Sequence, residues 1–316
     1  MTAFPRMKQD AAYKTKLGRA FIADSRGFME TLATESVDLV MTSPPFALLR
    51  QKDYGNVQEH EYIAWFMPFA KEIQRVLKPK GSFVLDIGGT WNRGEPTRSV
   101  YHYDLAVQLV RHGFYLAQDF FWYNPAKLPS PAEWVTVRRI RVKDSVNTVW
   151  WFSKTSNPKA SNKKVLNPYS DSMKYLLKNG YNTGLRPSGH DISDNFSRDN
   201  GGAIPSNLLQ IPNTESNTFY QRRCKEYGIK AHPARYPAGL PEFFIKMLTD
   251  PGDLVLDPFA GSNMTGQVSE ASGRRWISCD LDRDYVTASM FRFEGKFVER
   301  NIALPQRKLK LVVQTA

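Results

Sequence analysis

Two apolar runs are each typical of a buried strand, and each is followed by a segment that contains proline and phenylalanine. The presence of two such strand ends constrains the fold most. The first run, residues 37–41, leads into Thr42-Ser43-Pro44-Pro45-Phe46. The second run, residues 253–256, leads into Asp257-Pro258-Phe259-Ala260-Gly261-Ser262. Ligands of an open parallel sheet gather at the carboxyl ends of its strands. We therefore expect both segments to face one crevice, although they lie far apart in the chain.

Strand and helix patterns alternate along most of the sequence. Short apolar runs typical of buried strands occur at 20–23, 82–87, 120–122 and 276–279. Residues 61–77 and 241–248 instead carry apolar side chains at helical spacing, and Lys78-Pro79-Lys80-Gly81 is expected to end the first of these helices. Such alternation predicts an α/β fold with a doubly wound parallel sheet.

The composition changes over residues 124–231, which are rich in proline, asparagine, serine and lysine and have little regular periodicity. Such a composition is typical of an inserted, loop-rich recognition module. The expected domain organisation is an N-terminal extension at 1–19, a catalytic half at 20–123, the recognition module at 124–231, a cofactor-binding half at 232–298 and a C-terminal tail at 299–316.

The formal net charge of +12 favours a polyanionic partner, because lysine and arginine near phosphates release condensed counterions. No run approaches the roughly 20 apolar residues that span a bilayer, and residues 1–6 lack the apolar core of an export signal. The two cysteines, Cys224 and Cys279, agree with a reducing cytoplasm. The five histidines show no metal-ligand spacing with them. We expect a cytoplasmic protein with no membrane segment and no metal site.

The segment from Thr42 to Phe46 carries groups that suit methylation of an exocyclic amino group. Such a nitrogen is a poor nucleophile because its lone pair is delocalised into the base. The Ser43 hydroxyl and the Pro44 carbonyl can each accept one amino hydrogen, which turns the nitrogen toward tetrahedral geometry. Pro44 and Pro45 stiffen the loop, and Phe46 offers a face for stacking on a base. A base inside a duplex would have to be flipped out to reach this loop.

Ser-Pro-Pro-Phe alone also occurs in ordinary loops, but together with Asp-Pro-Phe-x-Gly-Ser it resembles the paired signature of DNA methyltransferases that modify exocyclic amino groups. The order, with the catalytic segment first, resembles the circularly permuted β class of that family. The resemblance covers most of residues 20–295 and implies a Rossmann-like methyltransferase sheet. It also implies S-adenosylmethionine as cofactor, double-stranded DNA as partner and a possible cognate restriction endonuclease, while the oligomeric state stays open.

By this resemblance, the loop that starts at Asp257 holds the methionine portion of S-adenosylmethionine, with Phe259 beside the sulfonium. Members of the family commonly have a second glycine where this chain has Asn263. Asp280 ends the next strand, like the acidic residue that binds ribose hydroxyls, and Asp24 could contact the adenine amino group. Either aspartate could instead cap a helix. The predicted cofactor-binding residues are Asp257, Pro258, Phe259, Ala260, Gly261, Ser262, Asn263, Asp280 and Asp24.

The resemblance also implies that Tyr123 and Asn124 form the far wall of a base pocket, with Tyr123 opposite Phe46. Tyr123 could equally be a core aromatic residue. A strand-like run at 135–143 alternates apolar and basic residues, which we interpret as DNA contacts or as a solvated strand face. The predicted target-base and DNA-contact residues are Tyr123, Asn124, Lys127, Arg138, Arg139, Arg141 and Lys143.

The serine before the two prolines favours N4 of cytosine as the target, and N6 of adenine is the alternative because both bases present the same amino geometry. Methylation of a ring carbon needs a cysteine nucleophile, usually after a proline, and neither Cys224 nor Cys279 fits. An RNA or protein methyltransferase and a catalytically silent DNA-binding module are further alternatives. We predict a site-specific DNA methyltransferase whose catalytic segment is Ser43, Pro44, Pro45 and Phe46.

Overall fold

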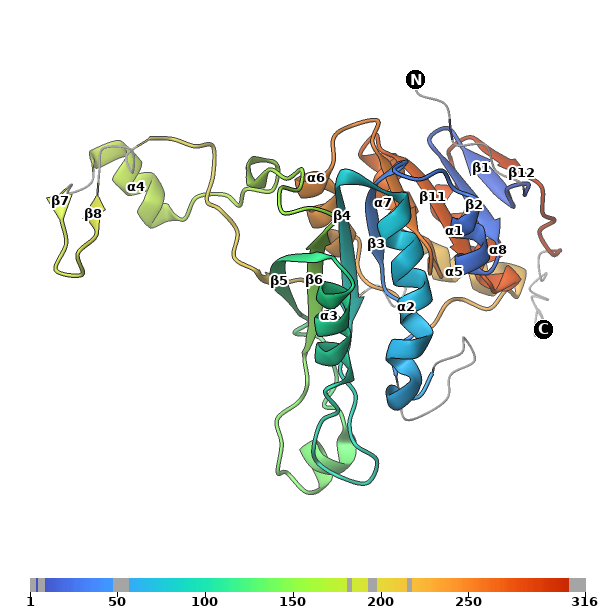
Figure 1. Ribbon diagram of the computed structural model, residues 1–316, viewed down its shortest axis with the longest axis horizontal. Coiled ribbons are helices and arrows are strands. Elements are labelled where there is room, and N and C mark those ends of the chain that lie inside the picture. The colour runs from blue at the N-terminus through green and yellow to red at the C-terminus, as the bar shows by residue number, and fades with distance from the viewer. Residues whose placement is uncertain are drawn as a thin grey trace, which may run out of the picture. The chain divides into compact units, whose positions relative to one another are not determined.

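The computed structural model describes residues 4, 9–47, 57–180, 184–192, 198–214 and 218–306 (Figure 1). It divides into two compact units, a larger one comprising residues 1–159 and 207–316 and a smaller one comprising residues 160–206. Within the described ranges, no helix is both long enough and apolar enough to cross a membrane.

The larger unit contains most of the regular structure. Its strands are β1 (Tyr13–Thr15), β2 (Gly18–Ile22), β3 (Val37–Thr42), β4 (Leu77–Ile87), β5 (Tyr115–Tyr123), β6 (Val146–Ser153), β9 (Leu208–Gln210), β10 (Leu254–Asp257), β11 (Arg275–Asp280) and β12 (Val298–Arg300). Its helices are α1 (Ser25–Glu30), α2 (Glu59–Val76), α3 (Tyr101–Arg111), α5 (Phe219–Tyr227), α6 (Gly239–Leu248), α7 (Met264–Ala271) and α8 (Arg283–Ser289). A π-helical turn covers Glu133–Val137, and a 3-10 turn covers Met290–Phe293.

These strands form one sheet in the order β12-β1-β2-β11-β10-β3-β4-β6-β5-β9 among the described residues. The central strands β2, β11, β10, β3 and β4 run parallel to one another. Strand β6 is antiparallel to both β4 and β5, because the chain returns from β5 through a loop and not through a crossover helix. The expected α/β class is confirmed, although the sheet is mixed and not wholly parallel.

Helices cover both faces of the sheet, because successive side chains of a strand point to opposite faces. Phe21 of β2 packs in the same core cluster as Phe28 of α1 and Phe66 of α2. The preceding residue, Ala20, packs with Val286 of α8. This two-sided arrangement is the doubly wound architecture that the sequence predicts.

The helix expected at 61–77 ends just before Lys78-Pro79-Lys80-Gly81, as the sequence predicts, but no loop follows it. Helix α2 covers Glu59–Val76, and the chain enters β4 directly at Leu77, which pairs with Val37 of β3. Lys78-Pro79-Lys80-Gly81 therefore belongs to the start of β4. Pairing with β3 extends the strand backwards past Pro79, which overrides the local preference of proline and glycine for a turn.

Part of the N-terminal segment predicted as an extension at 1–19 belongs to the sheet. Strand β1 pairs with β2 and β12, and the ring of Tyr13 lies 6.2 Å from that of Trp276 and 5.9 Å from that of Phe293. The segment is ordered because burial of Tyr13 ties it to this core. Residues 1–3, 5–8 and 307–316 of the predicted extension and tail lie outside the described residues.

The smaller unit, residues 160–206, covers only part of the sequence range predicted for the recognition module, 124–231. It contains a 3-10 turn (Asn162–Lys164), α4 (Asp171–Asn179), and the short antiparallel strands β7 (Gly184–Leu185) and β8 (Asp191–Ile192). The flanking parts of the predicted module supply β6, β9 and α5 to the larger unit, so its boundaries there follow the sheet and not the change in composition.

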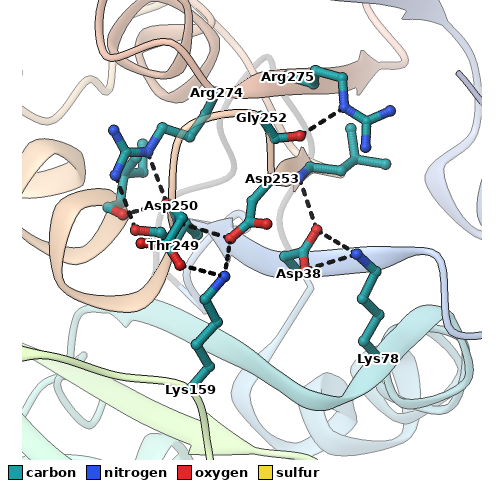
Figure 2. Close-up of polar contacts among 11 residues, drawn as sticks. Asp38, Lys78, Lys159, Thr249, Asp250, Gly252, Asp253, Arg274 and Arg275 are labelled. Atoms are coloured by element: carbon teal, nitrogen blue, oxygen red, sulfur yellow. Dashed lines mark hydrogen bonds and ion pairs between the residues drawn. The ribbon is translucent and has the colours of Figure 1, made fainter. Parts of the chain in front are cut away.

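A polar network joins strands β3, β4 and β10 at their amino ends (Figure 2). The Asp38 carboxylate of β3 accepts two hydrogen bonds from Lys78 Nζ, both 2.8 Å, and one of 2.9 Å from the Leu254 amide of β10. Lys159 Nζ lies 2.5 Å from the Asp253 carboxylate, which also accepts the Asp250 amide at 2.7 Å. The network therefore fixes β3, β4 and β10 side by side.

Substitution Asp38→Ala should lower the free energy of unfolding by about 2 kcal/mol, because it leaves the buried Leu254 amide without its acceptor. Urea denaturation measures this change. The matched control is Glu30→Ala, which removes an exposed ion pair of 3.7 Å with Arg26 and should cost under about 0.5 kcal/mol. Equal losses in the two variants would contradict a special role for Asp38.

Candidate active site

A cavity of about 1000 Å³ lies at the carboxyl ends of β2, β3, β4, β10 and β11. Both proline-aromatic segments line it, since Ser43–Phe46 follows β3 and Pro258–Ser262 follows β10. Parallel pairing of β10 with β3, in which Leu256 lies opposite Val40, brings these distant segments to one edge. The expected shared crevice is therefore present in the structure.

Ser43 holds a defined hydrogen bond at the cavity wall. Its hydroxyl donates to Asp86 Oδ2 at 3.1 Å. Because the hydroxyl hydrogen is used in this bond, the lone pairs of Ser43 Oγ remain as acceptors for an incoming donor. The loop around it is fixed by Tyr62, whose hydroxyl donates to the Pro45 carbonyl at 2.8 Å.

Phe46 packs across the end of β4. A Cβ atom on residue 88 would lie 2.6 Å from the Phe46 ring, so only glycine at this position admits the ring. The aromatic side chain thus keeps a fixed place beside Ser43 and lines the cavity.

Asp86 is a site residue that the sequence analysis missed. It sits in the largely apolar second half of strand β4, and its Oδ1 accepts a hydrogen bond of 3.3 Å from Asn147 Nδ2 of β6. Burial raises the pKa of Asp86 to about 6, against the opposing effect of the hydrogen bonds from Ser43 and Asn147. A lone carboxylate within the apolar run 82–87 was the available sequence signal.

Asp257, predicted to bind the cofactor, is buried behind the wall and is not among the residues lining the cavity in the described part of the chain. Its carboxylate accepts hydrogen bonds from Thr42 Oγ1 at 2.7 Å and from Thr265 Oγ1 at 2.6 Å. Burial raises the pKa of Asp257 to about 6. The residue links the ends of β3 and β10, so its contacts are those of a structural support.

Asn263, also predicted to bind the cofactor, likewise lies behind the wall. Its φ of 56° is in the left-handed region, which glycine and asparagine tolerate best, and this explains asparagine where the family commonly has glycine. Asn263 Oδ1 accepts the Gly266 amide at 3.1 Å at the start of α7, and Nδ2 donates to the Tyr13 hydroxyl at 2.9 Å. These bonds hold the loop, whose residues 258–262 line the cavity.

Asp280, at the end of β11, does line the cavity. Its carboxylate accepts the Gly261 amide at 2.7 Å and the Asp282 amide at 3.0 Å, and burial raises its pKa. Gly261 has a φ of +48°, and a Cβ there would lie 3.0 Å from the His232 ring. Glycine therefore lets this loop bend toward Asp280 beneath the segment that carries His232.

The remaining predicted cofactor residues have distinct surroundings. Phe259 packs against Trp65 and Phe69 of α2, with ring centroids 5.9 and 5.1 Å away. Asp24 lines the cavity, but its Oδ1 also caps α1 by accepting the Arg26 and Gly27 amides, both at 3.1 Å. Sequence reasoning found neither Trp65 nor the lining segment His232–Tyr236.

The far wall differs from the expectation by one residue. Trp122, Asn124 and Lys127 line the cavity, whereas Tyr123 is not among the lining residues in the ranges described. Tyr123 lies on strand β5, where neighbouring side chains alternate between faces, so only one of residues 122 and 123 can point to the cavity. Burial lowers the pKa of the Lys127 ammonium, although Asp144 and Asp86 oppose that effect.

The basic run at 135–143 is not a strand, and it lies outside the cavity lining. The π-helical turn at Glu133–Val137 is followed by irregular chain in which Arg138 bonds Glu133 at 2.9 Å. Arg141 lies 4.7 Å from the Trp91 ring, and Lys143 Nζ donates to the Pro125 and Lys127 carbonyls. Local ion pairs and ring contacts therefore replace the predicted alternating strand, and Arg139 at φ 54° is exposed.

Neither cysteine is placed as a nucleophile. Cys224 and Cys279 are buried, burial raises the pKa of both thiols, and neither is among the described cavity-lining residues. A thiol held neutral in this way is a poor nucleophile. Within the described ranges, no group of three or more histidine, cysteine, aspartate or glutamate residues could hold a metal ion.

Known proteins resemble the chain along most of its length. The type II methyltransferase M.PvuII of Proteus hauseri is 57% identical over 286 residues, which cover 89% of this chain and 85% of that protein. The DNA adenine methyltransferase YhdJ of Escherichia coli is 26% identical over 278 residues, covering 86% and 81% of the two chains.

Solved structures also resemble the chain along most of its length. A structure described as PvuII DNA methyltransferase (cytosine-N4-specific) superimposes with a TM-score of 0.75 and 49% identity, covering 94% of this chain and 92% of that one. TTHA0409 of Thermus thermophilus, solved in complex with S-adenosyl-L-methionine, shares the fold at a TM-score of 0.55 and 20% identity, covering 87% and 93%. A sequence profile of the family described as DNA methylase matches residues 37–291. The chain therefore belongs to the DNA methylase family.

Proposed function

We propose that this protein transfers a methyl group from S-adenosylmethionine to N4 of a cytosine flipped out of double-stranded DNA. The observation that carries the proposal is the Ser43–Asp86 hydrogen bond, which presents a serine oxygen to the cavity that the Pro258–Ser262 loop also lines. The relative that is 57% identical is a type II methyltransferase, and the solved structure at 49% identity is described as cytosine-N4-specific. Both support cytosine as the target.

In this proposal, Ser43 and Pro44 act on the amino group of the base. Ser43 donates its own hydrogen to Asp86, so its oxygen accepts one amino hydrogen and the Pro44 carbonyl accepts the other. The nitrogen lone pair then points away from the ring and toward the donor methyl group. Both acceptors are held before the base arrives, by Pro45 and by the bond from Tyr62, so little reorganisation is needed.

Phe46 and Trp122, which also line the cavity, supply aromatic faces against which the flipped base can stack. Asn124 and Lys127 stand on the same wall as Trp122 and can donate to the carbonyl edge of a cytosine. We assign these residues to the base subsite.

The other half of the cavity fits S-adenosylmethionine. Asp280 presents a carboxylate that can accept ribose hydroxyls, and the loop that bends at Gly261 lines the cavity where the methionine portion can lie. Phe259 gives an aromatic wall beside the sulfonium. When bound, this group supplies an electrophilic methyl on a sulfonium. Asp257 and Asn263 would act indirectly, by holding the loop.

Recognition of the DNA sequence is assigned to the smaller unit, residues 160–206, together with the flanks that complete 124–231. Among the predicted DNA contacts, Arg139 is the one whose exposed side chain we assign to phosphate binding. The names of the relatives make a cognate restriction endonuclease the expected partner system, in the bacterial cytoplasm where the DNA lies.

The direct test is incubation of the purified protein with unmethylated DNA and S-adenosylmethionine, followed by mass spectrometry of the released nucleosides. We expect N4-methylcytosine. N6-methyladenine would keep the chemistry at Ser43 but overturn the base assignment, in the direction of the adenine relative. Methyl transfer to RNA or protein in place of DNA would contradict the proposal.

Two substitutions should separate the two halves of the cavity. Ser43→Ala should reduce turnover by about 100-fold, because one preorganised acceptor is lost, while cofactor affinity stays within about twofold. Asp280→Ala should weaken cofactor binding by about tenfold or more, because hydrogen bonds to a charged acceptor are lost. Calorimetric titration with S-adenosylmethionine and single-turnover kinetics measure the two effects. The assignment fails if both variants lose the same property.

Methylation should slow as pH falls through about 6. Because the pKa of Asp86 is raised to about 6, the carboxylate accepts the Ser43 hydrogen above that pH and becomes protonated below it. A protonated Asp86 can donate to Ser43 and occupy the lone pair that the amino group needs. Single-turnover rates between pH 5 and 8 measure the profile.

Asp86→Asn should be slower and should lose the acidic limb of this profile. Asp257 has the same raised pKa and lies next to the loop through Thr42, so it is the internal comparison. If the limb persists unchanged in Asp86→Asn, Asp86 is not the titrating group.

A further inference from the structure

A lobe formed by residues 88–100 and 124–145 projects beyond the carboxyl end of β4 and the adjoining ends of β5 and β6 (Figure 1). The cavity is lined by three residues at the base of the lobe, Asn124, Lys127 and Ser145. Asn147, just beyond the lobe, also lines it. The lobe therefore begins at the wall of the active site, so DNA that delivers a base to the cavity must pass beside it.

The lobe exposes apolar side chains at its surface. Val142 is 85% exposed and Leu128 is 79% exposed, the two highest values among the exposed large hydrophobic residues that the structure describes. Lys143, next to Val142, donates to the Lys127 carbonyl at 3.2 Å, so the segments that carry Val142 and Leu128 run beside each other. Exposed apolar residues on adjoining segments are a feature of interaction sites.

The lobe is also held rigidly. Arg141 donates to the Pro96 carbonyl at 3.0 Å and lies over the Trp91 ring at 4.7 Å. Asp144 lies 3.5 Å from both Arg98 and Arg141. These contacts connect the two parts of the lobe, so Val142 is presented on a fixed support, as a side chain inserted between bases would need to be.

The charge of the lobe matches DNA. Seven lysine and arginine residues stand against three acidic residues in its two segments. Exposed apolar side chains on a lobe with an excess of positive charge fit a base stack bordered by phosphates, because cations contact the backbone while an apolar group enters between bases. A partner protein with an apolar surface would not need this excess of positive charge.

We propose that Leu128 and Val142 form a wedge that enters the duplex at the target base pair and fills the space left by the flipped base. The proposal rests on the proposed function, since it concerns how that substrate reaches the cavity. Flipping breaks base pairing and stacking, and a wedge that replaces the lost contacts favours the flipped state. Leu128 and Val142 are thus positioning residues that act on the DNA and not on the reacting atoms.

The test compares the double variant Leu128→Ala/Val142→Ala with wild type on two duplexes that carry a mapped methylation site. In one duplex the target base is paired, and in the other it faces an abasic site. We expect the single-turnover rate of the variant to fall at least tenfold on the paired duplex and to return to within threefold of wild type on the abasic duplex. The rise of 2-aminopurine fluorescence at the target position should fall in parallel on the paired duplex.

Two further variants serve as controls. Val110→Ala removes apolar surface from α3, where Val110 is 45% exposed, and should leave both rates unchanged. Arg139→Ala should weaken binding to both duplexes alike, as expected for a phosphate contact, with no selective rescue by the abasic site.

Several outcomes would overturn the wedge. Wild-type rates of the double variant on the paired duplex, or equal losses on both duplexes, would do so. A wild-type dimer in sedimentation that the double variant dissociates would assign the patch to self-association. If wild-type protein methylates neither duplex, the proposed function itself fails, which is a different result from an active wild type with an unaffected variant.

Discussion

The parallel pairing of β3 with β4 on one side and β10 on the other is the constraint on which the rest of the site depends. It places Ser43, Asp86 and the Pro258–Ser262 loop at one edge of the sheet, although they come from three distant parts of the chain. Polar contacts secure this pairing at both ends. Asp38 binds the amino end of β10 through the Leu254 amide, and Asp257 binds the carboxyl end of β3 through Thr42. Each carboxylate is buried, so its removal would leave buried donors unpaired.

The chemistry follows from the direction of one hydrogen bond. A serine hydroxyl can donate once and accept twice, and Asp86 takes the donated hydrogen. Ser43 Oγ is therefore left with acceptor lone pairs only, which suits an amino group and disfavours a group that can only accept. Burial makes this arrangement sensitive to pH, because it raises the pKa of Asp86 to about 6, close to neutral pH. Phe46 adds stacking surface without a donor, and the indole N–H of Trp122 already donates to the Ile211 carbonyl at 2.8 Å, so neither competes for Ser43.

Much of the fold and of the site could be predicted from sequence, for physical reasons that differ by residue. The α/β class followed from periodicity, and the shared crevice followed from strand ends at Ser43 and Pro258. Asp86 was missed because a lone carboxylate in an apolar run does not by itself show that it lies beside Ser43, 43 residues away in the chain. Tyr123 was predicted at the far wall, where the structure has Trp122, because the sequence gives the strand but not which of its side chains point to the cavity. The strand assigned to 135–143 was wrong because contacts such as Arg141 with Trp91 come from remote parts of the chain. Such tertiary contacts decide the conformation of a segment whose own sequence pattern is ambiguous.

The central claim is that Asp86 acts through Ser43. A double-mutant cycle of Ser43→Ala and Asp86→Asn, read out by single-turnover methylation of DNA at pH 7.5, tests it most directly. If Asp86 only orients the serine oxygen, the double variant should be no slower than Ser43→Ala alone, because the group that Asp86 orients is already gone. Losses that multiply across the two substitutions would show that Asp86 contributes independently, and would contradict the account.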